Sequence, residues 1–156
     1  MSNNLSILDF YENFDPNLIS FIKGHLFLEN AMNLILGRIG ISTNKTFSKK
    51  ISSLYSHSRI DTQTKDLLVE INDVRNDISH DLFYKLTFDK LFELVRLSSC
   101  AGVDYSDDTI FSNELLSKEW YDCDGIINEL FPNTFAFLLE NNEDLFPDNE
   151  ICNYLC

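Results

Sequence analysis

The chain has 156 residues, of which 44% are hydrophobic, with 5 glycines, 3 prolines and a formal net charge of −13 at pH 7. This composition is typical of one compact globular domain and excludes a fibrous or intrinsically disordered protein. Polar residues interrupt each apolar run before it could cross a bilayer, and the first residues lack the basic start of a secretory signal, so we expect a cytoplasmic protein without membrane contact.

The first predicted helix follows Asp15 and Pro16, a capping side chain before a residue whose φ is already suited to a helix. Apolar residues then recur at helical spacing to about Arg38, with Gly37 and Gly40 placed to end the helix. Because its apolar content is high all round, we place this helix at the centre of a bundle.

Three more helices are predicted before residue 101. Thr43 or Asn44 caps the first of them, Asp61 caps the second, and Thr87 caps the third. The connections are short, which favours antiparallel neighbours. Residues 1–100 are therefore predicted to form an all-α, up-and-down antiparallel helical bundle.

Residues 101–156 are predicted to form an acidic helical C-terminal extension. They hold one Lys against 13 Asp and Glu, whereas residues 1–100 hold 11 Lys and Arg against 12 Asp and Glu. Apolar residues persist, so we expect two short helices, broken near Pro132, that pack on the bundle or on a partner. Such a segment suits a solvated surface, a docking site for a basic protein, or a cover over a basic groove.

The four cysteines do not predict a metal site. Cys100, Cys123, Cys152 and Cys156 lack the close pairs of zinc modules, and none of the three histidines completes a set. We expect reduced thiols, no metal and no cofactor.

Arg75, Asn76 and His80 stand at the end of the helix that follows Asp61. Asn76 and His80 are four residues apart and share a face, and the long side chain of Arg75 can join them. Metal-free RNA cleavage by a 2′-hydroxyl needs a base, an acid and a cation, roles that histidine and arginine fill. The alternative from spacing alone is that Arg75 pairs with a neighbouring aspartate, while His80 caps the helix.

The string "RNDISH", residues 75–80, resembles the Arg-Asn-x-x-x-His signature of the HEPN superfamily of small helical proteins. Upstream, "KGHLFLENAMNLIL" is similar to an early helix of that family that carries a glutamate. The stretch "FSKKISSLYSHSRIDTQTKDLLVEINDVRNDISHD" follows the order of HEPN relatives, including the mannitol operon repressor group. The resemblance covers about residues 15–100 and leaves the acidic third unmatched.

The resemblance implies a homodimer with the signature on facing helices, and a metal-independent endoribonuclease of a toxin or phage-defence system. Arg75 and His80 would be catalytic and Asn76 supporting. The alternative it allows is a non-catalytic regulatory or protein-interaction module similar to the mannitol operon repressor group, with a basic partner or antitoxin on the acidic third. Some toxin members carry a tyrosine two residues after the histidine that an antitoxin modifies; here that position is Leu82, and Tyr84 is the nearest tyrosine.

Two further groups are candidate site residues. His25 and Glu29 share a helix face and are predicted to support the site, with Arg75 as a candidate partner for Glu29. The local basic cluster of Lys45, Lys49 and Lys50 is a candidate for binding RNA phosphates, against the plainer reading of a solvated surface.

Overall fold

The computed structural model describes residues 14–81, 83–147 and 150–155 of the chain. Within these ranges the fold is all-α, as predicted, with helix packed on helix and no strand. The elements in chain order are α2 (Pro16–Arg38), α3 (Phe47–Ser56), α4 (Thr62–His80), α5 (Phe88–Ala101), α6 (Thr109–Ser112), α7 (Glu114–Trp120), α8 (Asp122–Glu140), the 3-10 turn η1 (Glu143–Leu145) and α9 (Glu150–Leu155).

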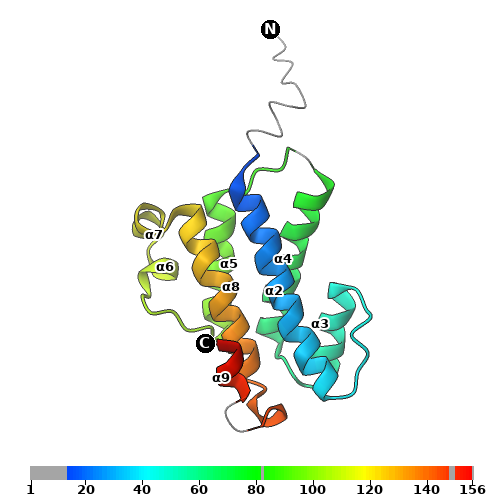
Figure 1. Cartoon of the computed structure of the whole chain (residues 1–156). Helices are drawn as coiled ribbons and strands as arrows, with labels where there is room; N and C mark the ends of the chain where they lie inside the picture. Colours follow the sequence, from blue (N-terminus) through cyan, green and yellow to red (C-terminus); the bar gives the residue numbers. More distant parts are fainter. Residues whose placement is uncertain (1–13, 82, 148–149, 156) are drawn as a thin grey trace.

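Helix α2 lies at the centre of the arrangement (Figure 1). It packs along α8 on one side and against α3 and α4 on the other, while α5 contacts both α4 and α8. The short helices α6 and α7 lie outside α5 and α8. One hydrophobic core joins residues from all the longer helices. None of the helices in the described ranges has the length and hydropathy needed to cross a bilayer.

The ends of α2 follow the predicted signals. The Asp15 carboxylate accepts a hydrogen bond from the backbone N–H of Asn17 at 2.9 Å, and Pro16 occupies the first helical position. After Arg38 the chain turns at Gly40, whose φ of 74° lies in the left-handed region that favours glycine. The Ile41 N–H then bonds the Leu36 carbonyl at 2.9 Å, which closes the helix end.

Helix α3 begins later than the sequence predicted. Its N-cap is Thr46, whose hydroxyl accepts from the backbone N–H of Lys49, so the prediction of Thr43 or Asn44 as the cap was wrong. The residues before Thr46 form turns instead: the N–H of Asn44 bonds Ser42 Oγ, and that of Lys45 bonds the Thr43 carbonyl. Such side chains compete with helix formation by bonding nearby backbone groups.

The predicted break at Pro132 was also wrong, because α8 runs through it without interruption. Pro132 is exposed, and the Asn133 side chain donates to the Glu129 carbonyl at 2.8 Å in the turn where a backbone donor is missing. The helix also buries apolar residues on α2 and α5, and this packing favours a continuous helix. The acidic part of the chain thus contributes a long helix to the common core.

The contact between α2 and α8 is close at Gly24. A Cβ placed on Gly24 would lie 2.2 Å from Cδ2 of Phe131. The Phe131 ring also meets Phe21 edge to face, with centroids 5.0 Å apart, and Phe27 stacks on Phe135 at 4.0 Å. A residue without a side chain at Gly24 therefore allows the two helices to approach over these rings.

Candidate functional site

Arg75 and Asn76 border a pocket of about 400 Å³ between α2, the start of α3 and α4. The residues that line it are His25, Glu29, Thr46, Phe47, Ser48, Asn72, Arg75 and Asn76. Four of the predicted site residues are therefore brought together here: Arg75, Asn76, His25 and Glu29. The pocket combines residues from three helices, so helix packing and not local sequence assembles it.

Helix α4 positions its share of the site through its apolar stripe. The Asp61 carboxylate accepts from the Thr64 N–H at 2.8 Å, and this bond lowers the pKa of Asp61. The buried residues Leu67, Leu68, Ile71, Val74 and Ile78 then hold one face of α4 on the core. Asn72, Asn76 and His80 follow one another at four-residue steps on another face, as a row along the helix.

Arg75 carries an unneutralised charge into the pocket. Its side chain is half-buried, and Nη1 donates to Asn76 Oδ1 at 3.2 Å. It forms no ion pair with a carboxylate of the described residues, Asp73, Asp77 and Asp81 included. The guanidinium therefore keeps most of its donors available for an anion.

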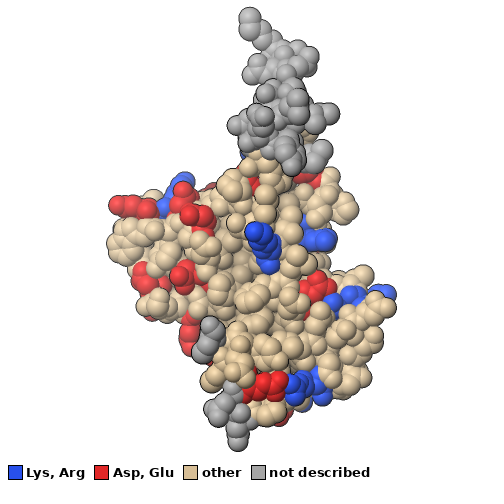
Figure 2. Space-filling view, viewed as in Figure 1, with Lys and Arg blue, Asp and Glu red and all other residues tan. Residues whose placement is uncertain are grey.

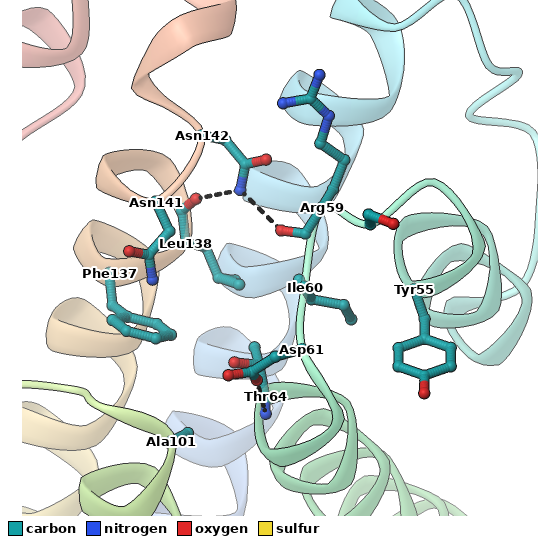
Figure 3. Close-up of a pocket in the computed structure, with 11 residues that line it drawn as sticks. Tyr55, Arg59, Ile60, Asp61, Thr64, Ala101, Phe137, Leu138, Asn141 and Asn142 are labelled. Carbon is teal, nitrogen blue, oxygen red and sulfur yellow. Dashed lines mark hydrogen bonds between the residues drawn. The ribbon is translucent and has the colours of Figure 1, made fainter.

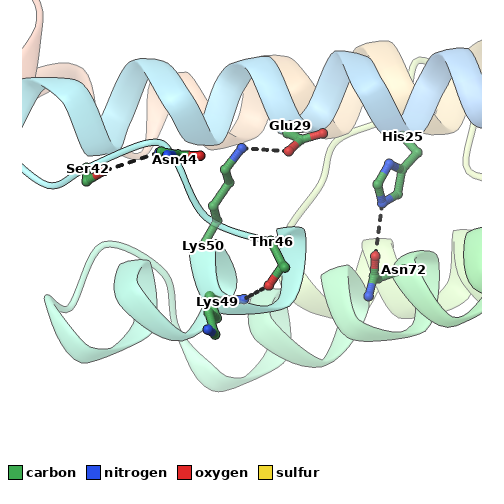
Figure 4. Close-up of polar contacts among 8 residues, drawn as sticks. All are labelled: His25, Glu29, Ser42, Asn44, Thr46, Lys49, Lys50 and Asn72. Atoms are coloured by element: carbon green, nitrogen blue, oxygen red, sulfur yellow. Dashed lines mark hydrogen bonds and ion pairs between the residues drawn. The ribbon is translucent and has the colours of Figure 1, made fainter.

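His25 is buried on the opposite wall. Its Nε2 lies 3.1 Å from Asn72 Oδ1, and its ring stacks on Phe47 with centroids 3.9 Å apart (Figure 4). Burial is the largest influence on His25 and lowers its pKa from the ordinary value of 6.5. The positive charge of Arg75 also lowers this pKa, whereas the hydrogen bond to Asn72 and the negative charge of Glu29 raise it by less than the total lowering. The imidazole is therefore neutral near pH 7, and because Asn72 Oδ1 can only accept, Nε2 carries the proton.

Glu29 pairs with Lys50 and not with Arg75, its predicted candidate partner. Lys50 Nζ lies 2.6 Å from Glu29 Oε1 and is almost fully buried (Figure 4). Lys45 Nζ donates to Ser53 Oγ at 2.9 Å, whereas Lys49 is exposed. The three lysines thus point in different directions and do not form one exposed cluster.

His80 stands apart from the pocket. It is the last residue of α4, it is exposed, and it does not line the pocket that Arg75 and Asn76 border. It lies one helical turn beyond Asn76 on the row that starts at Asn72. Leu82, the position compared with the tyrosine of some toxins, lies outside the described residues, and Tyr84 is half-buried.

Sequence reasoning missed Asn72 and the first turn of α3. Asn72 is the hydrogen-bond partner of His25, and Thr46, Phe47 and Ser48 line the pocket. Asn72 had a signal, because it stands four residues before Asn76 on the same face. The contribution of α3 had none, since it depends on how that helix packs against α2 and α4.

A larger hollow of about 760 Å³ lies between the α3–α4 connection and the end of α8 (Figure 3). Three of its polar side chains, those of Asn142, Arg59 and Asp61, make contacts that hold the fold together, while Asn142 Oδ1 has no hydrogen-bond partner among the described residues. Asn142 Nδ2 donates to the carbonyls of Arg59 at 3.2 Å and Leu138 at 2.9 Å, and Arg59 pairs with Asp144 at 2.8 Å. Asp61 caps α4. These contacts join η1 and α8 to the α3–α4 connection, so the hollow is a weaker candidate for chemistry than the smaller pocket.

The acidic segment lies away from the pocket. Carboxylates gather over α6 and α7, while most lysines and arginines in the same view lie over α2, α3 and α4 (Figure 2). No residue of the segment 101–147 or 150–155 lines the pocket. The described part of this segment therefore does not cover it.

The described residues offer no group of three or more His, Cys, Asp or Glu side chains that could hold a metal ion. Cys100, Cys123 and Cys152 are free thiols, and Cys156 lies outside the described ranges. Arg75, His25 and the amides of Asn72 and Asn76 are groups that bind anions or move protons.

The buried His25 predicts a pH dependence of stability. Its folded pKa lies below 6.5, so on acidification the unfolded chain takes up a proton that the folded chain resists. This contribution is fully present above the unfolded pKa and is lost as the pH falls through the folded one. Between about pH 7.5 and about pH 5, urea titrations should show a larger loss of unfolding free energy for the wild type than for His25→Phe. An equal loss in both proteins would contradict a buried, neutral His25.

Comparisons with family models, curated proteins and solved structures found no match for this chain.

Proposed function

We propose that this protein is a metal-independent endoribonuclease of the HEPN type that acts as a homodimer, in a toxin or phage-defence setting. The observation that carries the proposal is the position of Arg75 and Asn76 at a pocket with a free guanidinium, with His80 exposed one turn further along the same helix. The sequence resemblance of residues 75–80 to the HEPN signature supports the same reading.

The proposed reaction is an internal transesterification of RNA. The 2′-oxygen attacks the adjacent phosphorus and loses its proton to a base, the bond from phosphorus to the 5′-oxygen breaks, and an acid gives that oxygen a proton. The products are a 2′,3′-cyclic phosphate and a free 5′-hydroxyl. Arg75 binds the non-bridging oxygens as charge builds on phosphorus, and Asn76 holds the Arg75 side chain in place.

A dimer supplies the second proton-transfer group. One chain contributes one exposed signature histidine, His80, because His25 is buried and bonded to Asn72. Two α4 helices facing each other across a two-fold axis would bring both His80 side chains to one phosphate, one as base and one as acid.

The net charge of −13 opposes RNA binding, but its distribution favours the pocket side of the molecule. The first 100 residues are almost neutral overall, and the carboxylates in Figure 2 gather over α6 and α7. Helix α3 holds Lys49 and Lys50 and no Asp or Glu, so an RNA strand that approaches the start of α3 avoids the acidic surface of α6 and α7.

The test is incubation of the purified protein with mixed RNA in EDTA, with analysis of the cut ends. We expect cleavage to persist under chelation and to leave 2′,3′-cyclic phosphate. Loss of cleavage in EDTA with recovery on adding Mg²⁺ would contradict the mechanism. Cleavage that leaves 3′-hydroxyl ends would contradict it independently.

The second candidate function is a non-catalytic interaction module, which the surface of α7 favours. Leu115 is 82% exposed and Trp120 is 59% exposed, beside the acidic Glu114 and Glu119. Such a surface suits a basic, partly apolar protein segment. Because Trp120 is the single tryptophan, its fluorescence reports directly on binding of a partner there.

A further inference from the structure

The pocket beside Arg75 presents hydrogen-bond donors from α4 and from the start of α3, next to the carboxylate of Glu29 and the ring of Phe47. Each Asn side chain has one oxygen acceptor and one NH₂ donor group. Asn72 Oδ1 is occupied by His25 Nε2, and Asn76 Oδ1 is occupied by Arg75 Nη1. Protein donors thus use both amide oxygens, and the NH₂ groups remain for a ligand.

The start of α3 adds donors from a second direction. The first N–H groups of a helix have no carbonyl partner within the helix. At α3 the Thr46 hydroxyl accepts from Lys49, so the N–H groups of Phe47 and Ser48 stay without an intrahelical or capping bond. Both residues line the pocket, and the helix dipole gives this end partial positive charge.

The one carboxylate in the lining does not cancel this character. Glu29 lies 2.6 Å from the ammonium group of the buried Lys50, which offsets its charge. Arg75 has no such partner among the described carboxylates. The balance of charge inside the pocket is therefore positive.

We infer that this donor pocket, formed by His25, Asn72, Arg75, Asn76 and residues 46–48, holds a phosphate group, namely a backbone phosphate of an RNA strand. His25 acts as a positioning residue, because its Nε2 proton fixes the Asn72 amide with NH₂ toward the ligand. A volume of about 400 Å³ accommodates a phosphate with part of its nucleotide. That the pocket binds a phosphate group follows from its donor groups alone. That this phosphate belongs to an RNA strand rests on the proposed function.

The phosphate in the pocket is not the one that is cut. Asn72 precedes His80 by eight residues, which is about 12 Å along a helix. His80 does not line the pocket, whereas Asn72 does. Asn72 and residues 46–48 therefore anchor the strand at one phosphate. Arg75 borders the pocket, and its remaining donors also bind the neighbouring phosphate, which is the one that reaches His80 and is cut.

The decisive variant is Ser48→Asp, with Ser52→Asp as its matched control. Both serines are exposed on α3, but only Ser48 lines the pocket. A carboxylate in the first turn of a helix is favourable, so Ser48→Asp should keep the fold while it blocks an anion. Asn72→Asp, with Asn30→Asp as control, tests the other wall by replacing the donor NH₂ with a charged oxygen.

The ligands are inorganic phosphate and a 2′-O-methyl oligoribonucleotide, which has the RNA backbone but cannot be cleaved. We expect Ser48→Asp and Asn72→Asp each to weaken binding of both ligands by about tenfold in titration calorimetry, and the controls by less than about twofold. Equal affinities for variant and control would overturn the inference. Binding of inorganic phosphate but not of the oligonucleotide would overturn the conclusion that the bound phosphate belongs to an RNA strand, and would indicate free phosphate as the ligand.

The same proteins separate this inference from the proposed function. If Ser48→Asp weakens oligonucleotide binding and the wild type cleaves no RNA, the phosphate pocket is supported and the ribonuclease proposal is contradicted. If Ser48→Asp cleaves limiting RNA at the wild-type rate, the ribonuclease proposal is supported, and the role of the pocket as an anchor for the strand is contradicted.

Discussion

Replacing His80 with alanine should lower the rate of RNA cleavage by about 10²- to 10⁴-fold, the usual contribution of a proton-transfer group. The fold should be unaffected, because His80 is exposed at the last position of α4 and its side chain has no hydrogen bond within the described residues. We expect its free energy of unfolding to stay within about 0.5 kcal/mol of the wild type. Initial rates on a fluorogenic RNA and urea titrations measure the two quantities.

The matched control is His57→Ala. His57 is also exposed and also ends a helix, where Nδ1 lies 2.8 Å from the Ser53 carbonyl. It is remote from the proposed site in sequence and lines neither pocket described above. Cleavage should therefore remain. A similar loss in both variants, or no loss in His80→Ala, would remove His80 from the mechanism.

Two substitutions at Arg75 separate the contribution of its positive charge to cleavage from that of its planar set of donors. Arg75→Lys keeps the cation but loses the planar donor fork, so its cleavage rate should fall between those of the wild type and Arg75→Ala. Because Arg75 is half-buried and bonded to Asn76, Arg75→Ala should also cost some stability. The comparison with Lys therefore distinguishes a role on phosphate from a role in the fold.

Helix starts were predictable from the sequence where a single residue is the evident N-cap, with a side chain that accepts from the first backbone N–H groups of the helix. Asp15, Asp61 and Thr87 each cap the helix that the sequence assigned to them. The start of α3 was not, because several residues before it can all bond backbone groups, and Thr46 is the one that does. Continuity at Pro132 depends on packing against α2 and α5, which no local pattern contains.

Relations along one helix were also predictable, whereas partners across helices were not. The common face of Asn76 and His80 follows from the helical repeat. The pairing of Glu29 with Lys50 and of His25 with Asn72 depends on the rotation and offset of α2 against α3 and α4. Sequence spacing cannot fix these, so Arg75 was a reasonable but incorrect partner for Glu29.

The charge of the whole chain is a poor guide to this site. At ordinary salt, screening limits the electrostatic interactions of an exposed charge to a range of about 10 Å. The groups that line the pocket therefore affect RNA binding more than carboxylates on the far side of the molecule do. Those groups include the Arg75 guanidinium, which has no ion pair within the described residues, the amides of Asn72 and Asn76, the start of α3, His25, and a Glu29 carboxylate that is paired with Lys50. The same screening predicts that binding of RNA weakens with added salt through Arg75 and Lys49 and depends little on α6 and α7.

Gly24→Ala should be among the most destabilising single changes in the core. The new Cβ would lie 2.2 to 2.6 Å from three atoms of the Phe131 ring, against 3.4–4 Å for ordinary contact. Phe131 is itself buried and held edge to face by Phe21, so neither the ring nor α8 can move without disturbing other contacts. We expect a loss of about 1–3 kcal/mol in the free energy of unfolding, the usual cost of overpacking.

Gly37→Ala, in the same helix, is the control and should have the opposite sign. Nothing lies within 4 Å of a Cβ at Gly37, which is exposed near the end of α2. Alanine there should raise stability by about 0.5–1 kcal/mol, because it removes the entropic cost of glycine in a helix. Urea titrations of both variants measure the difference. A neutral Gly24→Ala would mean that α2 and α8 separate without cost, and that their contact does not fix the position of His25 one residue further along α2.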